Sequence, residues 1–246
     1  MPLILTTAYF PPVSYFAAIA AQMGGLKSYK GEDRRQIPSS PLIPSVVYVE
    51  ACENFQKQSY RNRCRFYAAD GVQDLSVPLV HEGGRKIPID KVRIDYSKPW
   101  LLQHKRAIVS AYRTSAYFEY YQDEIFAVLD SGHETLLELN MALLQLFIKN
   151  LGLAVDLRVT EEYSPNCQSS PEVAVPDHSL PGPVLCKDLR EAIHPKHPDT
   201  ILSDLGIEKP YFQVFSRKYG FKSNLSAMDL LFNEGPDSIL FLYPDL

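Results

Sequence analysis

The sequence contains little cysteine and no long apolar segment. Its 246 residues include four cysteines, and no two of them have the CxxC spacing of a zinc or redox site: Cys52, Cys64, Cys167 and Cys186. Four scattered cysteines do not form the disulfide framework of a small secreted domain, so we expect reduced thiols. No apolar run approaches the roughly 20 residues of a membrane span, and the opening MPLILTTAYFPP lacks the features of a signal peptide. The sequence therefore predicts a cytoplasmic protein without a membrane span.

The common catalytic motifs are absent as well. The chain has no Walker loop, no GxGxxG, no GxSxG and no HExxH. His194 and His197 flank Pro195 in a segment that is typical of a surface turn, and we assign no metal there. The sequence thus identifies no cofactor and none of the familiar catalytic routes.

What is present is enough apolar material for a large core. The residues are 46% hydrophobic and 11% aromatic, which excludes global disorder, and the length suits one domain over residues 1–246. Residues 1–110 carry 15 Lys and Arg against 9 Asp and Glu, a net of +6, whereas residues 111–246 carry 10 against 20, a net of −10. Because the whole-chain pI is only about 5.9, we expect no nucleic-acid partner. The excess of basic groups lies in residues 1–110, where they could bind a small anionic ligand.

Hydrophobic patterning predicts an α/β fold. Residues 3–8 and 46–50 read as buried strands on either side of a helix at 14–23, which is the unit that builds a parallel sheet. The other expected elements are a hairpin of 63–67 and 75–80 that turns near Asp70-Gly71, strands at 92–96 and 153–160, and helices at 97–112, 116–130, 134–151 and 211–219. Ser97 is the expected cap of the helix at 97–112, and Ser226 begins another helix near the end. We therefore predict a mainly parallel or mixed sheet covered by helices, with a helical middle segment and surface loops at 26–45 and 163–186.

The most unusual window is NFQKQSYRNRCR, residues 54–65. In an extended chain, Arg61, Arg63 and Arg65 would share one face. Three guanidinium groups on one face can bind phosphate or carboxylate. The alternative is a solvated sheet edge that is kept basic against aggregation.

Other candidates are aromatic or imidazole side chains. His104 lies on the apolar side of its expected helix, where it could be a general base or a packing residue. Tyr9 and Tyr15 follow the first strand, where ligands of open α/β sheets bind. They could stack on a sugar or a base, or pack in the core.

Several segments together resemble the WbqC-like protein family of bacteria. They are AYFPPVSYF, ENFQKQSYRNRCR, LSVPL, KPWLLQHKRAIVSAYRTSAYFEYY and GFKSNLSAMDLLFNEGP. Many members have a Gln-Pro-Tyr-type turn where this chain has Ala8-Tyr9-Phe10. The resemblance implies a role in surface polysaccharide (O-antigen) biosynthesis. By this resemblance, the residues of this chain that match the family's motif positions are Asn54, Lys57, Arg61, Asn62, Arg63, Trp100, His104 and Tyr112.

These observations favour a group-transfer enzyme that acts on a nucleotide-linked or phosphorylated sugar. Arg61 and Arg63 would bind phosphate, Lys57 would neutralise developing charge, and His104 would be the base. The remaining expected substrate contacts are Asn54, Asn62, Tyr9, Tyr15 and Tyr112. The transfer would be acyl or aminoacyl transfer to an amino sugar, or nucleotidyl transfer. The alternative is a non-enzymatic scaffold or a glycan-precursor binding protein, with other biosynthetic enzymes as partners. An enzyme should bring Arg61, Arg63 and His104 into one cleft, whereas a scaffold should show no such cleft.

Overall fold

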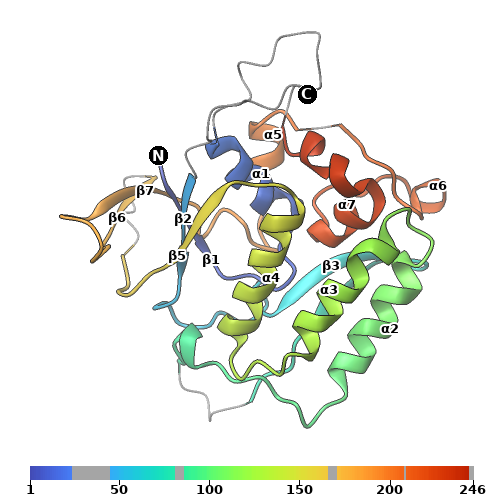
Figure 1. Cartoon of the computed structure of the whole chain (residues 1–246), viewed down its shortest axis with the longest axis horizontal. Coiled ribbons are helices and arrows are strands. Elements are labelled where there is room, and N and C mark those ends of the chain that lie inside the picture. The colour runs from blue at the N-terminus through green and yellow to red at the C-terminus, as the bar shows by residue number, and fades with distance from the viewer. Residues whose placement is uncertain (24–44, 81–85, 166–170, 208, 244–246) are drawn as a thin grey trace.

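The computed structural model describes residues 1–23, 45–80, 86–165, 171–207 and 209–243 (Figure 1). Within these residues, five strands form one mixed sheet in the order β5-β2-β1-β7-β6. Their bounds are β1 Leu3–Thr6, β2 Ser45–Glu50, β5 Val155–Val159, β6 Glu172–Val175 and β7 Val184–Asp188. The α/β class and the mixed sheet expected from the sequence are therefore confirmed. The expected loop at 26–45 lies outside the described residues except for its last position.

The centre of the sheet is parallel. Strand β1 pairs in parallel with β2 on one side and with β7 on the other, and β5 continues the parallel order beyond β2. Strand β6 is antiparallel to β7 at the edge. The chain leaves β1 for β2 and returns to the opposite side of β1 much later, so the strand order changes direction at β1. Ligands of open α/β sheets bind outside the carboxyl ends of the strands at such a point.

Side-chain alternation along the central strands builds a core on each face of the sheet. Leu3, Leu5, Val47 and Val49 point into the main core, which is shared with the helices. Ile4 and Tyr48 point the other way, into a small second cluster. Figure 1 shows the helices gathered on one side of the sheet: α1 Val13–Gln22, α2 Trp100–Tyr112, α3 Phe118–Asp130, α4 Leu136–Asn150, α5 Ile201–Asp204, α6 Ser216–Tyr219 and α7 Ala227–Glu234. None of the described helices has the length and apolar character needed to cross a bilayer.

Local signals explain several element boundaries. Thr135 and Glu138 form a reciprocal capping box at the start of α4. Ser226 accepts a hydrogen bond from the Met228 N–H at the start of α7, as expected. Strands β3, Arg63–Ala68, and β4, Gly71–Ser76, form the predicted hairpin as a separate two-stranded sheet. Its second strand starts directly at the turn, four residues earlier than the predicted 75–80. Gly71 turns this hairpin with φ +105°, a backbone region that favours glycine.

Three expectations were wrong. Residues 92–96 form no strand; the short 3₁₀ helix η2, Ile89–Lys91, precedes them and they make isolated bridges. Helix α2 begins after Pro99 and not at Ser97. The Ser97 hydroxyl donates a hydrogen bond to Asp95 and does not cap the helix. Helix in 211–219 is confined to α6.

The expected surface loop at 163–186 contains β6 and most of β7. The prolines that favoured a loop lie beside these strands and not within them, since Pro171, Pro176 and Pro183 flank their ends. Strand β6 is also an edge strand, where proline near the ladder is tolerated. A second 3₁₀ helix, η3, Gly235–Phe241, follows α7.

Candidate functional site

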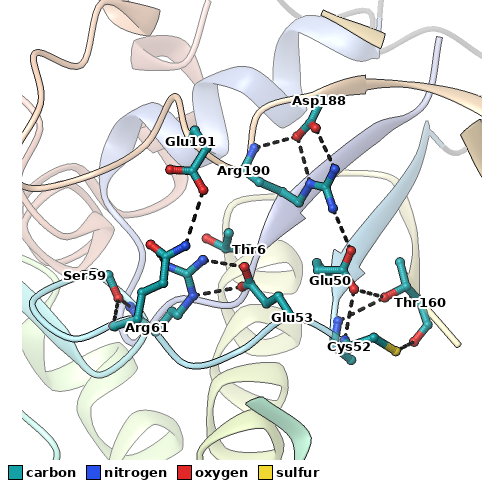
Figure 2. Close-up of polar contacts among 12 residues, drawn as sticks. Thr6, Glu50, Cys52, Glu53, Ser59, Arg61, Thr160, Asp188, Arg190 and Glu191 are labelled. Carbon is teal, nitrogen blue, oxygen red and sulfur yellow. Dashed lines mark hydrogen bonds and ion pairs between the residues drawn. The ribbon is translucent and has the colours of Figure 1, made fainter. Parts of the chain in front are cut away.

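A buried carboxylate ends strand β2. Glu50 is fully buried, at 0% exposure, and three donors meet its carboxylate (Figure 2). One oxygen accepts from the Thr160 hydroxyl at 2.7 Å and from the Cys52 N–H at 2.9 Å, and the other accepts from Arg190 at 2.8 Å. The end of β2 and the segments after β5 and β7 are therefore joined through one charged side chain.

Arg190 follows β7 and is as buried as its partner. Its Nε and Nη2 donate to the two oxygens of Asp188 at 3.0 and 2.7 Å, and its Nη1 donates to the Ser164 carbonyl at 2.7 Å as well as to Glu50. Such planar, bidentate pairing is the geometry in which a buried guanidinium is best compensated. The pairing holds the carboxyl-terminal ends of the strands in fixed positions.

A second buried ion pair lies beside the first. Arg61 Nε and Nη2 donate to the two oxygens of Glu53 at 2.8 and 2.6 Å. Burial raises the pKa of Glu53, and Arg61 opposes that shift. Arg61 precedes β3 and turns inward with 2% exposure. The expectation that Arg61 shares one face with Arg63 and Arg65 is therefore wrong, because Glu53 draws its guanidinium into the protein.

One cleft opens over these ion pairs. It has a volume of about 490 Å³ and combines carboxylates, amides and aromatic rings. We call it the carboxylate cleft. Its lining residues are Cys52, Glu53, Asn54, Phe55, Gln56, Lys86, Tyr163, Arg190 and Glu191. Burial raises the pKa of the Cys52 thiol, which keeps it protonated near neutral pH.

A second cleft of about 610 Å³ has a different charge. We call it the basic cleft, because four cationic side chains line it and none of its described lining residues is acidic. The lining comprises Lys57, Arg63, Lys86 and Lys98 together with Phe55, Gln58, Asn62, Val77, Pro78, Leu79, Val80, Ile87 and Val92. Lys98 lies 3.6 Å from Asp95. The Arg63 Nε is buried and makes no hydrogen bond to another described residue.

The two clefts meet at a common wall. Phe55 and Lys86 line both of them. The wall is held by backbone hydrogen bonds, from the Phe55 N–H to the Ile87 carbonyl and from the Ile89 N–H to the Glu53 carbonyl, both at 2.8 Å. The boundary between the clefts is therefore fixed by main chain as well as by side chains.

The structure brings four of the predicted site residues to these clefts. Lys57, Asn62 and Arg63 line the basic cleft, and Asn54 lines the carboxylate cleft. The Asn62 amide donates to the Val77 carbonyl at 3.0 Å, which orients it. These positions remain compatible with ligand contact.

The other predicted residues lie in the core. His104 is 4% exposed, and its Nδ1 lies 2.9 Å from the Tyr9 hydroxyl. Burial lowers the pKa of His104 to about 4, so the ring is neutral near pH 7. Tyr15 donates to the Thr6 carbonyl at 3.0 Å, and the Tyr112 hydroxyl accepts from the Tyr67 N–H at 3.2 Å. None of these four predicted residues is among the described residues that line either cleft, so they act here as packing and hydrogen-bonding groups.

The charged residues at the strand ends were not predicted from the sequence. Glu50 and Glu53 follow the apolar VVYV strand, and Arg190 and Glu191 follow β7. A polar residue directly after a buried parallel strand is the available signal, since that is where such sheets bind ligands. Their pairing over as many as 140 positions has no local signature.

Comparisons with known proteins agree with the motifs. The model of the WbqC-like protein family matches residues 45–178, which include β2, the hairpin and helices α2 to α4. The chain is 25% identical over 198 residues to the uncharacterized protein Rv1507c of Mycobacterium tuberculosis, covering 75% of this chain and 81% of that protein. No solved structure matches it. Because the family match spans more than half of its length, this chain belongs to the WbqC-like protein family.

Proposed function

We propose that the protein is a group-transfer enzyme of bacterial surface polysaccharide (O-antigen) biosynthesis that binds a nucleotide-linked or phosphorylated sugar. One observation carries this proposal: the basic cleft gathers four cationic side chains with no acidic residue among its described lining. A cleft of one charge attracts a ligand of the opposite charge and concentrates it. The family membership supports the polysaccharide context.

The cations of the basic cleft come from separate segments of the chain. Lys57 precedes β3, Arg63 begins it, and Lys86 and Lys98 lie on the segment between β4 and α2. Arg63 offers the planar, permanently charged donor group that suits phosphate. Lys57 and Lys86, which make no ion pair with another described residue, would neutralise the charge of the bound phosphate. The phosphate-binding role that was expected of Arg61 is therefore assigned to Arg63 and the neighbouring lysines.

The structure also changes the roles expected of other residues. Arg61 positions Glu53 and the His104 ring lies in the core, so the expectation that an enzyme joins Arg61, Arg63 and His104 in one cleft is wrong for this chain. The proposal therefore rests on Arg63 and its cleft, and it gives His104 no role as a base. Transfer of a nucleotidyl group and transfer of an acyl or aminoacyl group to an amino sugar both place a phosphate in the enzyme when the sugar is phosphorylated or nucleotide-linked. The basic cleft serves either reaction.

The first test is phosphate binding by the whole chain. Inorganic phosphate, pyrophosphate, UDP and UDP-N-acetylglucosamine are titrated by calorimetry into the wild type, Arg63→Ala and Arg65→Ala. Arg65 is the matched control, since it lies on the same strand and is exposed outside the two clefts. We expect Arg63→Ala to weaken binding about tenfold or more, as loss of a charge-assisted contact does, and Arg65→Ala to bind as the wild type does.

The outcome that contradicts the proposal is equally definite. If none of the four probes binds the wild type, or if Arg63→Ala and Arg65→Ala bind them equally well, the basic cleft is not a phosphate site. For any nucleotide sugar that does bind the wild type, the reaction mixtures are analysed by mass spectrometry. A transferred group supports the enzyme, whereas binding without any product favours a glycan-precursor binding protein.

A further inference from the structure

We propose that the carboxylate cleft binds the sugar ring of the ligand whose phosphate occupies the basic cleft, with Glu53 and Glu191 accepting hydrogen bonds from its hydroxyl groups. This inference rests on the proposed function and adds to it the orientation of the ligand and the residues that select its sugar. It follows from the geometry of Glu53, the mixed lining of the cleft and the wall that the two clefts share.

Glu53 is a fixed acceptor with unused capacity. Its two oxygens each accept one hydrogen bond from Arg61. A carboxylate oxygen has two lone-pair sites, so each oxygen can accept another hydrogen bond. Arg61 is itself anchored, because its carbonyl accepts from the Asn140 amide at 2.8 Å. A hydroxyl donor entering the cleft therefore meets an acceptor that is already oriented, which lowers the entropic cost of binding.

Glu191 faces the same cleft from the other side. Its carboxylate accepts from the Gln56 amide at 3.5 Å, and the Gln56 amide oxygen accepts from Arg61 Nη1 at 3.5 Å. Glu191 is therefore linked to Glu53 through Gln56 and the Arg61 guanidinium. Amides and carboxylates provide the donors and acceptors that hydroxyl groups need. The ring of Tyr163, which is 52% exposed, and that of Phe55 supply apolar surface for the carbon face of a sugar.

The charges of the two clefts differ in the way that a sugar phosphate requires. The carboxylate cleft is lined by Glu53 and Glu191 against Arg190 and Lys86, so its acidic and basic groups balance. Such a surface suits a neutral, hydroxylated group, whereas the basic cleft suits an anion. Lys86 lines both clefts and stands where the phosphate joins the sugar. A ligand with one anionic end and one hydroxylated end thus matches both surfaces at once.

The test measures what the sugar adds to phosphate binding. Inorganic phosphate and the 1-phosphates of glucose, galactose, mannose, glucosamine and N-acetylglucosamine are titrated into the wild type, Glu53→Gln, Glu191→Gln and Glu124→Gln. Glu191 is exposed, so its variant keeps the fold even if Glu53→Gln disturbs the pair with Arg61. Glu124 is the matched control, an exposed glutamate on α3 that pairs with Lys149.

We expect at least one sugar phosphate to bind the wild type about tenfold more tightly than inorganic phosphate, as hydrogen bonds to charged groups provide. Glu191→Gln should reduce this difference severalfold and leave the affinity for inorganic phosphate unchanged, whereas Glu124→Gln should change neither. If every sugar phosphate binds as phosphate does, or if the difference survives in both cleft variants, the carboxylate cleft is not the sugar subsite. That result leaves the proposed function standing, because its failure would show as loss of phosphate binding itself.

Discussion

Arg190 and Glu50 form an ion pair that is almost completely removed from solvent. The distance from Nη1 to Oε2 is 2.8 Å, and the side chains are 2% and 0% exposed. The two residues stand 140 positions apart, after β7 and at the end of β2, with β1 between these strands. The pair therefore ties together the edge of the sheet over which the carboxylate cleft opens.

Breaking this pair should be costly. Arg190→Met leaves Glu50 as a buried charge without its partner, and we expect the free energy of unfolding in urea to fall by about 3–5 kcal/mol. Lys149→Met is the control, because Lys149 and Glu124 are 67% and 46% exposed and such pairs contribute at most about 1 kcal/mol. The double variant Glu50→Gln/Arg190→Met should be more stable than Arg190→Met alone. Equal losses in Arg190→Met and Lys149→Met would show that the buried pair has no special role.

Much of the fold could be predicted from local pattern. The apolar runs around Leu3 and Val47 and the helical spacing of the middle third indicated the sheet and its helices. The Asp70-Gly71 turn indicated the hairpin. Each of these signals lies within one element, where periodicity and turn chemistry act. Strand β6 could not be found in this way, because its pairing with β7 forms at an edge of the sheet and is surrounded by prolines.

The candidate site was predicted only in part, for a different reason. Arg63 and Lys57 were found because they lie in one basic window. The inward turn of Arg61 depends on Glu53, and the burial of His104 depends on how α2 packs, so neither can be derived from strand or helix periodicity. Lys86 and Glu191 reach their clefts through tertiary contacts between distant segments. The local sequence thus identified types of chemistry, and tertiary structure decided which residues take part.

His104 should make the protein less stable in acid. Its pKa is lowered by burial from 6.5 to about 4, so the unfolded chain binds this proton more readily than the folded one. The stability that the neutral His104 ring contributes is fully present above about pH 6.5, and it falls as the pH drops towards 4. Relative to His104→Gln, the wild type should lose about 3 kcal/mol of unfolding free energy between pH 7 and pH 4. Parallel pH profiles of the two proteins in urea unfolding would contradict this prediction.

Asp229 should act in the opposite direction. It is 1% exposed, and its Oδ2 accepts from the Tyr211 hydroxyl and the Gln213 amide, both at 2.7 Å. Burial raises its pKa from 3.8 to about 6, so the folded protein binds this proton more readily than the unfolded chain does. Its contribution to stability is therefore lost as the pH rises through 6. Relative to Asp229→Asn, the wild type should gain about 2 kcal/mol from pH 7 to pH 4. A constant difference between the two proteins across urea titrations at pH 7, 6, 5 and 4 would show that the carboxyl does not titrate in this way.

Gly235 ends helix α7 at a place where the backbone and the packing both require glycine. Its φ is +55°, and a β-carbon there would lie 2.5 Å from ring carbons of Tyr117. Gly132, which follows α3, has a similar φ of +70° but has no atom within 4 Å of such a β-carbon. Gly132→Ala should therefore cost only the backbone strain of about 1–2 kcal/mol, whereas Gly235→Ala should cost about 1–3 kcal/mol more because the half-buried Tyr117 ring must move. Thermal and urea unfolding of the two variants separate these contributions. Equal destabilisation would mean that Tyr117 yields without cost and that only the backbone conformation selects glycine at the end of α7.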